Sequence, residues 1–398
     1  MPNSNIHSLR SARAWPATVF LILLLSTAHT QAPPTAPHPD PLVNRILQPP
    51  LRSMPRIERA WDALLPRIGS RHETVLTDDG VPIAYTVIEP GAFLLRPRVA
   101  FDRETWDFDI VLEARGKKAP RVVGTVVLTH GWGLDARSVL PWAVIFGERG
   151  YRTVLVDLRG HGRSGSSPIT FGYREALDLA AVIRELRKQA RVREPLALFG
   201  VSYGAVAAIH TAADPEVGVD ALIAMEPFTN AGDAIRRMGG FAKEGGSGSW
   251  RKRLAAWWAR TKISGDDFER ALDRASQSIG TDLRTHDTAP FLARVPVCTL
   301  LIQGGADNLV DVRAVRAMAR ANPARVVYAE APKEGHLTLP ARFDWLGKPV
   351  ADWLDAALTA ALVGDPSETP AQLACPALKA SNDSRRRQSL ERSPVSPS

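Results

Sequence analysis

The sequence predicts an α/β domain built on a mostly parallel β-sheet with helices on both faces. From Val122 onward, short buried apolar runs alternate with stretches of helical spacing, a pattern typical of a parallel sheet that is covered on both sides. Four of these runs end in glycine-rich turns that carry polar side chains, and such turns gather at the carboxyl edge of a parallel sheet. Hydrophobic residues make up 45% of the 398-residue chain, which is enough for a large core.

The residue patterns place the elements in order along the chain. Helical spacing at 56–68 predicts a helix, and period-two spacing then predicts extended segments at 72–76, 81–88 and 105–112. A hairpin turn is expected at Asp78-Asp79-Gly80. The parallel part is expected to contain strands at 125–128, 153–156, 196–199, 221–225, 297–302 and 325–328, and helices at 138–148, 173–188, 312–320 and 350–362.

The N-terminal segment predicts export. Arg10 and Arg13 precede an uncharged run, 15–28, and small residues follow, which is the layout of a signal peptide over 1–30. The run is shorter than the roughly 20 apolar residues that span a bilayer, so cleavage is favoured and an uncleaved membrane anchor is the alternative. We therefore expect a periplasmic or secreted protein with no stable membrane span after cleavage.

The segments that flank the folded domain have other compositions. Residues 31–55 are dense in proline, which cannot hold a helix interior or a central strand, and are expected to form an extended leader. Residues 364–398 are polar and proline-rich and predict a disordered tail. The folded domain is thus expected over 56–363. The two cysteines, Cys298 and Cys375, are too few for a disulfide framework or a metal site.

The net charge of +8 comes from scattered arginines without a basic cluster interleaved with aromatics, so nucleic acid is not expected as a partner. A strand-free excursion at about 229–295 predicts a cap over a site. It contains a glycine-rich break between Gly239 and Gly248 and predicted helices at 250–261 and 266–279. Trp250, Trp257 and Trp258 either line a pocket for an apolar substrate group or attach the cap to the body.

Ser202 is the candidate nucleophile. It lies between Gly200 and Gly204, after a buried strand and before a small-residue helix, where side chains at the flanking positions would collide and the strained turn lifts the hydroxyl above the sheet. A serine hydroxyl needs a base and a third group that orients the base. His336, after the last strand, is the expected base, and Asp307, after the preceding strand, is the expected acid.

Each assignment has a rival that the residues leave open. Glu226 ends a strand just before the cap and could orient the histidine instead of Asp307. Asp311 stands where a helix N-terminus favours an acid, so a structural role is expected there. His130 and His161 lie on loops at strand ends, but glycine-rich turns favour a hydrogen-bonding role within the loop; His210 and His286 are also expected to be structural.

Negative charge that develops on a carbonyl oxygen needs at least two donors. The backbone N–H of Tyr203 is the first candidate, because it directly follows the nucleophile. The second is the N–H of Trp132, which Gly131 and Gly133 flank. These two groups form the expected oxyanion hole.

Loops at the ends of five predicted strands carry the motifs His130-Gly131-Trp132-Gly133, Asp157-x-Arg159-Gly160-His161-Gly162-x-Ser164, Gly200-x-Ser202-x-Gly204, Gly305-x-Asp307 and Gly335-His336. In this order, and over roughly 73–362, the chain resembles the α/β-hydrolase superfamily. The resemblance implies an eight-stranded, mostly parallel sheet, a Ser-His-Asp triad without cofactor or metal, and a cap at the place where this superfamily inserts its lid. The segment 171–186 is similar to that of esterases and serine aminopeptidases.

The expected function is that of a carboxylesterase-like serine hydrolase acting on a small-molecule ester or amide. An aminopeptidase would need acidic residues to bind an ammonium group, for which Asp266, Asp267 and Glu269 are candidates. A lipase, an acyltransferase and a non-catalytic binding protein are further alternatives on the same scaffold. The loop at Trp132 lacks the run of glycines found in some lipase-like members, which disfavours a lipase for bulky esters. The serine at position 202 disfavours members that use an aspartate nucleophile. The oligomeric state does not follow from the sequence.

Overall fold

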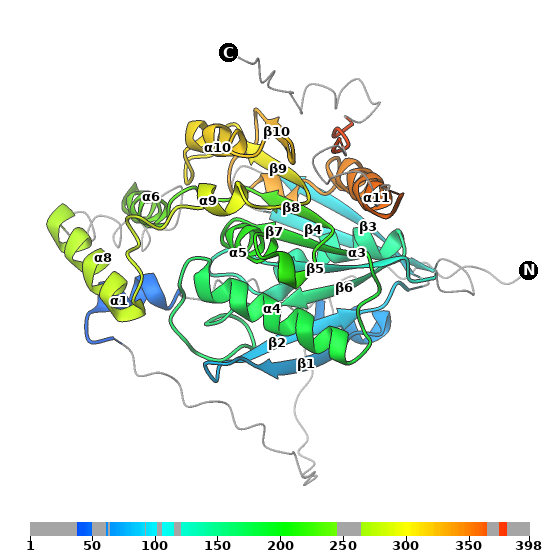
Figure 1. Cartoon of the computed structure of the whole chain (residues 1–398), viewed down its shortest axis with the longest axis horizontal. Coiled ribbons are helices and arrows are strands. Elements are labelled where there is room, and N and C mark those ends of the chain that lie inside the picture. Colours follow the sequence, from blue (N-terminus) through cyan, green and yellow to red (C-terminus); the bar gives the residue numbers. More distant parts are fainter. Residues whose placement is uncertain are drawn as a thin grey trace, which may run out of the picture. The chain divides into compact units, whose positions relative to one another are not determined.

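A computed structural model describes residues 38–49, 61–62, 64–91, 93–101, 106–114, 121–244, 264–363 and 374–379. Its centre is an eight-stranded sheet in the order β1-β2-β6-β5-β7-β8-β9-β10 (Figure 1). The strands are β1 (Arg71–Leu76), β2 (Pro82–Ile88), β5 (Gly124–Thr129), β6 (Tyr151–Val156), β7 (Leu196–Val201), β8 (Ala221–Met225), β9 (Cys298–Gly304) and β10 (Val326–Ala331).

The sheet is mostly parallel, as the sequence predicts. Only β2 runs against its neighbours, pairing antiparallel with β1 and with β6, and all pairs from β6 to β10 are parallel. The hairpin turn between β1 and β2 lies at the expected Asp78-Asp79-Gly80. The predicted fold class is therefore confirmed, with the carboxyl ends of β5 to β10 at one edge.

Two hydrophobic cores lie on opposite faces of the sheet because successive side chains of each strand point to opposite sides. Along β7, Leu196 and Leu198 belong to one core and Ala197 and Phe199 to the other. Helices α4 (Tyr173–Lys188), α5 (Tyr203–Ala212) and α10 (Val312–Ala319) pack in the first core. Helices α3 (Leu140–Glu148) and α11 (Gly347–Val363) pack in the second (Figure 1).

A separate two-stranded sheet lies between β2 and β5 in the chain. Its strands β3 (Phe93–Phe101) and β4 (Trp106–Ala114) pair antiparallel from Phe93 with Ala114 to Phe101 with Trp106. The expected extended segment at 105–112 corresponds to β4. The helix expected at 56–68 ends in a 3₁₀ turn, Leu65–Ile68, and residues 51–60 lie outside the described part of the chain.

The expectation of an extended leader over 31–55 is wrong for its described part, which contains the helix α1 (Pro41–Leu47). Proline is tolerated in the first helical turn, and here Pro41 opens the helix while the Asp40 side chain accepts hydrogen bonds from the N–H groups of Leu42 and Val43. Val43, Ile46 and Leu47 are buried in the first core. The predicted signal peptide lies outside the described residues.

The cap segment contains two described helices, α6 (Ala231–Glu244) and α8 (Gly265–Ile279), followed by the short α9 (Ala289–Leu292). The second predicted cap helix corresponds to α8, which a Ser264–Asp267 capping box begins. The predicted glycine-rich break is wrong at Gly239 and Gly240, because α6 runs through both. The predicted helix at 250–261, with its three tryptophans, lies outside the described residues.

The tail prediction is also wrong in part. Residues 374–379 are attached to the domain by a disulfide between Cys375 and Cys298, at the start of β9. The Trp353 Nε1–H of α11 donates a 2.7 Å hydrogen bond to the Pro376 carbonyl, and Leu378 is buried in the second core. The sequence alone does not reveal this pairing, because the two cysteines are 77 positions apart. The rest of the tail lies outside the described residues.

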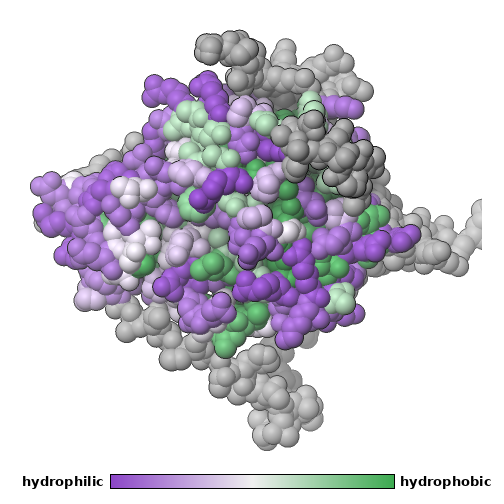
Figure 2. Space-filling view, viewed as in Figure 1, coloured by the Kyte–Doolittle hydropathy of each residue, from purple (hydrophilic) through white to green (hydrophobic). Residues whose placement is uncertain are grey.

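Across the described part of the chain, every helix is too short or too polar to cross a bilayer. Figure 2 shows hydrophilic side chains over most of the face that carries α4 and α8, with apolar side chains in small separate areas. Exposed large apolar residues in the described part of the chain include Leu76, Tyr173 and Leu177. Single exposed apolar residues of this kind are normal on protein surfaces.

Candidate active site

Ser202 lies at a strained turn between β7 and α5, with a φ of 53°. The flanking glycines are required by close backbone contacts: a Cβ at Gly200 would lie 2.4 Å from the Gly204 carbonyl oxygen, and one at Gly204 would lie 2.5 Å from the His130 carbonyl oxygen. The turn therefore brings Ser202 against the loop that follows β5, as the sequence predicts for the elbow.

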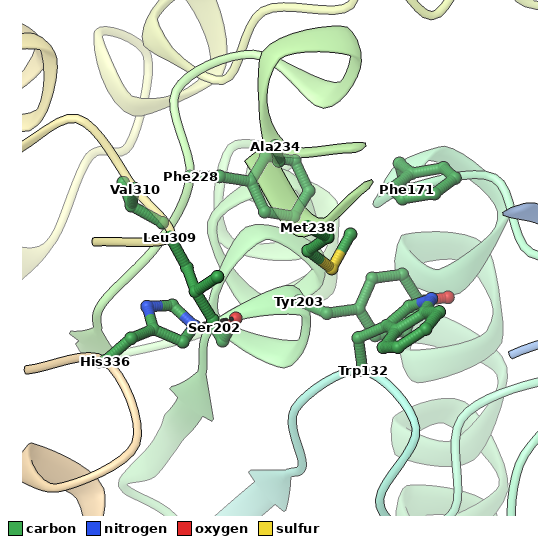
Figure 3. A pocket seen from close by; sticks show the side chains of 10 residues that line it. All are labelled: Trp132, Phe171, Ser202, Tyr203, Phe228, Ala234, Met238, Leu309, Val310 and His336. Atoms are coloured by element: carbon green, nitrogen blue, oxygen red, sulfur yellow. Dashed lines mark hydrogen bonds between the residues drawn. The ribbon is translucent and has the colours of Figure 1, made fainter. Parts of the chain in front are cut away.

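His336 lies beside Ser202 although 134 positions separate them in the chain. Its Nε2 is 2.8 Å from Ser202 Oγ, and its Nδ1 is 2.7 Å from Asp307 Oδ2. Since an ionised carboxylate only accepts, the Nδ1–H donates to Asp307, and Nε2 is free to accept the Ser202 hydroxyl. Figure 3 shows His336 directed at Ser202 across the floor of a pocket. The structure brings the three predicted residues into one hydrogen-bonded chain.

Asp307 is held firmly in this position. Its Oδ1 accepts hydrogen bonds from the N–H groups of Leu309 and Val310 at 2.8 and 2.9 Å, and its Oδ2 accepts a further one from Gln303 Nε2 at 2.7 Å. The Asp307 side chain is fully buried. Gln303 is a contributor that sequence reasoning missed, although a buried amide at the end of an apolar strand is a signal that could have found it.

The rival acids lie in different surroundings. Glu226 Oε2 is 3.8 Å from His336 Nδ1, too far for a hydrogen bond, so Asp307 is the acid in contact. Burial, and the nearby charge of Asp307, raise the pKa of Glu226 well above its usual value. Asp311 caps α10, where its Oδ1 accepts from the Arg313 N–H, as expected for a helix N-terminus.

The other candidate histidines hydrogen-bond within their loops. His130 Nε2 accepts from the Leu158 N–H, and its Nδ1–H donates to the Gly131 carbonyl. His161 Nε2 accepts from the Gly133 N–H, and its Nδ1–H donates to the Arg159 carbonyl. Burial lowers the pKa of His130 to about 4 and that of His161 to about 3, so both imidazoles are neutral near pH 7.

Trp132 and Tyr203, whose N–H groups are the expected oxyanion donors, both line the pocket that contains Ser202. Tyr203 is the first residue of α5, where a helix leaves backbone N–H groups without intrahelical partners. Trp132 lies in the loop that Gly204 contacts, between the anchored residues Gly131 and Gly133. Within the described residues, the N–H groups of Trp132 and Tyr203 make no backbone hydrogen bond, so both are available to an incoming oxygen.

A small pocket with a cavity volume of about 30 Å³ opens beside Ser202 (Figure 3). Phe171 enters it from a tight segment in which the buried Glu175 accepts hydrogen bonds from the Thr170 and Gly172 N–H groups. His336 is the only ionisable side chain among the described residues of its lining apart from the Tyr203 phenol. The lining consists of Trp132, Phe171, Ser202, Tyr203, Phe228, Ala234, Met238, Leu309, Val310 and His336.

Glu226, Asp307 and His336 each offer one atom within 4.8 Å of the others, a spacing that could also suit a metal ion. The hydrogen bonds described above already use Nδ1 and Nε2 of His336. Because a metal would have to displace one of them, this arrangement favours proton transfer over metal binding.

Comparisons with known proteins identify the family and support the fold. The model of the alpha/beta hydrolase family matches residues 126–346, which contain all five site residues. Among curated proteins, the uncharacterized protein YqkD of Bacillus subtilis (strain 168) is 30% identical over 105 residues, which cover 26% of this chain. The match covers 34% of that relative, so the chain spans about a third of its length.

Two solved structures of the esterase Pf2001 of Pyrococcus furiosus are similar to this chain. The forms in space groups P212121 and P21 have TM-scores of 0.51 and 0.52, and both are 17% identical. Each match covers 74% of this chain and 94% or 96% of the esterase. At this identity the likeness concerns the fold.

Proposed function

We propose, from the premise that the chain belongs to the alpha/beta hydrolase family, that it is a serine hydrolase that cleaves carboxylic esters through an acyl-enzyme. The observation that carries the proposal is the hydrogen-bonded chain from Ser202 through His336 to Asp307, at 2.8 and 2.7 Å. Such a chain supplies the base that a serine hydroxyl needs and fixes the tautomer of that base.

In the first half of the reaction, Ser202 Oγ bonds to the ester carbonyl carbon while its proton moves to His336 Nε2. The carbonyl π electrons move to the oxygen, which the N–H groups of Trp132 and Tyr203 stabilise. The carbonyl then re-forms, the bond to the leaving alcohol breaks, and the imidazolium gives its proton to that alcohol. Asp307 stays ionised and balances the imidazolium charge.

In the second half, water takes the place of the alcohol. His336 Nε2 removes a proton from the water while the water oxygen bonds to the acyl carbon. Collapse of the second oxyanion breaks the bond to Ser202 Oγ, and His336 returns its proton to that oxygen. The products are the acid and the free enzyme, and no group outside the chain, substrate and water is consumed.

The pocket supports an ester with an uncharged, apolar acyl group of modest size. Its described lining carries no carboxylate that could bind a substrate ammonium group. Two of the three acidic candidates on α8 are engaged elsewhere, since Asp267 caps the helix and pairs with Arg270, and Glu269 pairs with Arg236 and Arg284. Asp266 lies in the first turn of α8 and is not part of the described pocket lining. These contacts favour an esterase over an aminopeptidase.

The remaining alternatives share this site. An acyltransferase would use the same residues with an alcohol or amine in place of water, and a lipase would need room for a long acyl chain. The cavity volume of about 30 Å³ beside Ser202 is small and favours short acyl chains. A binding protein without catalysis would have no need of a base at 2.8 Å from the hydroxyl.

The test is covalent labelling combined with a substrate screen. A fluorophosphonate should label the native protein and leave Ser202→Ala unlabelled, and p-nitrophenyl acetate and butyrate should be hydrolysed faster than the laurate ester and aminoacyl anilides. Turnover of the preferred ester should fall about 10⁶-fold in Ser202→Ala, as for other nucleophilic serines.

Ser278→Ala is the matched control, because this exposed serine of α8 lies outside the pocket. It should label and turn over like the native protein. Absence of labelling in the native protein would exclude the serine mechanism. Faster cleavage of aminoacyl anilides would assign a peptidase, and ester consumption that yields a new ester only when an alcohol is added would assign an acyltransferase.

We also propose that the protein is exported through its N-terminal apolar run. The disulfide between Cys298 and Cys375 supports this proposal, because disulfides persist in oxidising compartments. N-terminal sequencing of exported protein should give a first residue between His29 and Pro33. An intact Met1 in exported protein would contradict cleavage and favour the membrane anchor.

A further inference from the structure

Glu226 is a second carboxyl group beside the imidazole, and the mechanism above does not use it. It directly follows β8 and has a φ of 53°, a left-handed conformation that costs energy for a residue other than glycine. Its side chain is fully buried, and neither oxygen makes a hydrogen bond of ordinary length and angle within the described residues. Its Oε2 lies 3.8 Å from His336 Nδ1.

The surrounding chain leaves space for this carboxyl group. At Gly304, the last residue of β9, a Cβ would lie 2.8 Å from Glu226 Oε1 and 2.5 Å from the Glu334 carbonyl oxygen. A side chain at position 304 would therefore displace Glu226 from the imidazole. The left-handed backbone of Glu226 after β8 directs this side chain towards His336, and the absence of a side chain at Gly304 leaves room for it.

The two carboxyl groups differ in their partners. Asp307 accepts hydrogen bonds from Leu309, Val310, Gln303 and His336, which stabilise its charged form. An ionised Glu226 would be buried with the Gly304 N–H as its only stabilising backbone contact among the described residues, and it would lie next to a second negative charge. The other acid that faces it, Glu334, adds further repulsion and forms an ion pair with Arg342.

We propose that Asp307 and Glu226 carry one negative charge between them, on Asp307 in the native protein, and that Glu226 is a positioning residue able to orient His336 when Asp307 cannot ionise. This inference rests on the proposed function, because it concerns the base of the same reaction. In the native protein Glu226 is the neutral member of the pair, and its proton limits the negative charge beside the imidazole to one.

Asp307→Asn exposes this second role. The Oδ1 position accepts two backbone N–H groups, so the amide oxygen of the asparagine occupies it and the amide nitrogen faces His336. An N–H donor facing Nδ1 favours the imidazole with its proton on Nε2, which cannot accept from Ser202. The charge of residue 307 is also gone, so Glu226 can ionise, and a shift of about 1 Å brings it to hydrogen-bond distance from Nδ1–H.

The experiment is a double-mutant cycle on p-nitrophenyl ester hydrolysis with Glu226→Gln and Asp307→Asn. A wrong tautomer without a second acceptor costs about 10⁴ in turnover. We expect Asp307→Asn to lose about 10³, and the double variant to lose the full 10⁴ or more. Glu226→Gln should therefore lower kcat/KM about 10-fold more in the Asp307→Asn background than in the native background. Equal losses in both backgrounds would overturn the proposal, because packing alone acts equally in both.

The pH profile provides an independent readout. Because Glu226 is neutral in the native protein, Glu226→Gln should leave the midpoint of the acidic limb of kcat/KM in place. A fall of one unit or more would mean that the charge lies on Glu226 and would also overturn the proposal. In Asp307→Asn, ionisation of Glu226 should add an acidic limb that the double variant lacks.

Two controls keep the outcomes apart. Glu216→Gln makes the same exchange at an exposed position of the turn Pro215–Val217 and should behave like the native protein. Asp307→Ala repeats the cycle should the asparagine variant fail to fold. If the native protein neither hydrolyses esters nor reacts with a fluorophosphonate, the proposed function fails; if it does both and the cycle is additive, only the role of Glu226 fails.

Discussion

Ser202 and Glu226 leave neighbouring parallel strands at the same register, and both have a φ of 53°. Their predecessors, Val201 and Met225, are paired residues, and the Ser202 N–H donates a 2.7 Å hydrogen bond to the Met225 carbonyl. The Glu226 N–H likewise donates to the Ile302 carbonyl of β9. Each left-handed residue costs roughly 1–3 kcal/mol, and the surrounding packing maintains both. The result is that both side chains leave the sheet at the edge where His336 lies.

Gly204→Ala should disrupt the elbow. The new Cβ would lie 2.5 Å from the His130 carbonyl oxygen and 2.8 Å from Thr129 backbone atoms, and backbone cannot move aside as a flexible side chain can. We expect a loss of about 3 kcal/mol in the free energy of unfolding, at the upper end for overpacking, together with loss of esterase activity. Urea unfolding of the purified variant measures the first effect.

Gly147→Ala is the matched control for this change. Gly147 lies in α3, and a Cβ there would have no heavy atom within 4 Å apart from its chain neighbours and the backbone of its own helix. Since alanine favours a helix over glycine, this variant should gain about 0.5–1 kcal/mol and keep full activity. Equal stability of the two variants would contradict the requirement for glycine at the elbow.

The sheet and the three hydrogen-bonded residues could be predicted because their signals are local. Helix α4 coincides with its predicted range because its apolar residues recur at helical spacing, and β8 coincides with its range because it is a short apolar run between polar segments. Ser202, Asp307 and His336 each follow a strand within a glycine-containing loop, and in a parallel sheet this brings them to one edge. No long-range contact had to be known beforehand.

The parts that could not be predicted depend on long-range contacts. The glycines of α6 suggest a break, yet a Cβ at Gly239 would lie 2.9 Å from the Phe268 ring of α8, so this glycine permits close packing of two helices. The tail is fixed by the disulfide at Cys375, whose partner the spacing does not reveal. The charge state of Glu226 depends on burial and on Asp307, neither of which is visible in the local sequence.

Ala234→Leu should narrow the pocket. Ala234 lies on α6 and lines the cavity beside Ser202, where a larger side chain takes space from an acyl chain. We expect kcat/KM for p-nitrophenyl butyrate, relative to the acetate, to fall about 10-fold, because one or two methylenes in an apolar pocket are worth that much. The exposed Ala321→Leu should leave the ratio unchanged. A constant ratio in Ala234→Leu would place the acyl group elsewhere.

Cys375→Ser should lower stability without lowering turnover. The disulfide links cysteines 77 positions apart and joins the tail to the start of β9, whereas Asp307 follows the other end of that strand. Removing such a bond typically costs about 3 kcal/mol. Thermal unfolding of the variant should therefore show a lower Tm, while its kcat for ester hydrolysis stays unchanged. The double variant Cys298→Ser/Cys375→Ser should lose no more stability than Cys375→Ser alone. A fall in kcat with native stability would contradict this view.

His210 should make the protein sensitive to acid. Its ring stacks on Phe291 at 3.7 Å between centroids, and neither nitrogen makes a hydrogen bond of ordinary geometry within the described residues. Burial, with repulsion from His286, lowers the pKa of His210 to about 3, and Arg294 over the Phe291 ring adds to the repulsion. The unfolded chain binds a proton near pH 6.5 and the folded one does not, so stability falls as the pH drops from 6.5 towards 3.

His210 should account for about 2 kcal/mol of the loss in the free energy of unfolding between pH 7 and pH 5. In His210→Phe, the free energies of unfolding measured with urea at pH 7 and pH 5 should differ by about 2 kcal/mol less than in the native protein, whatever the variant's stability at pH 7. An unchanged difference would mean that His210 is protonated in the folded state.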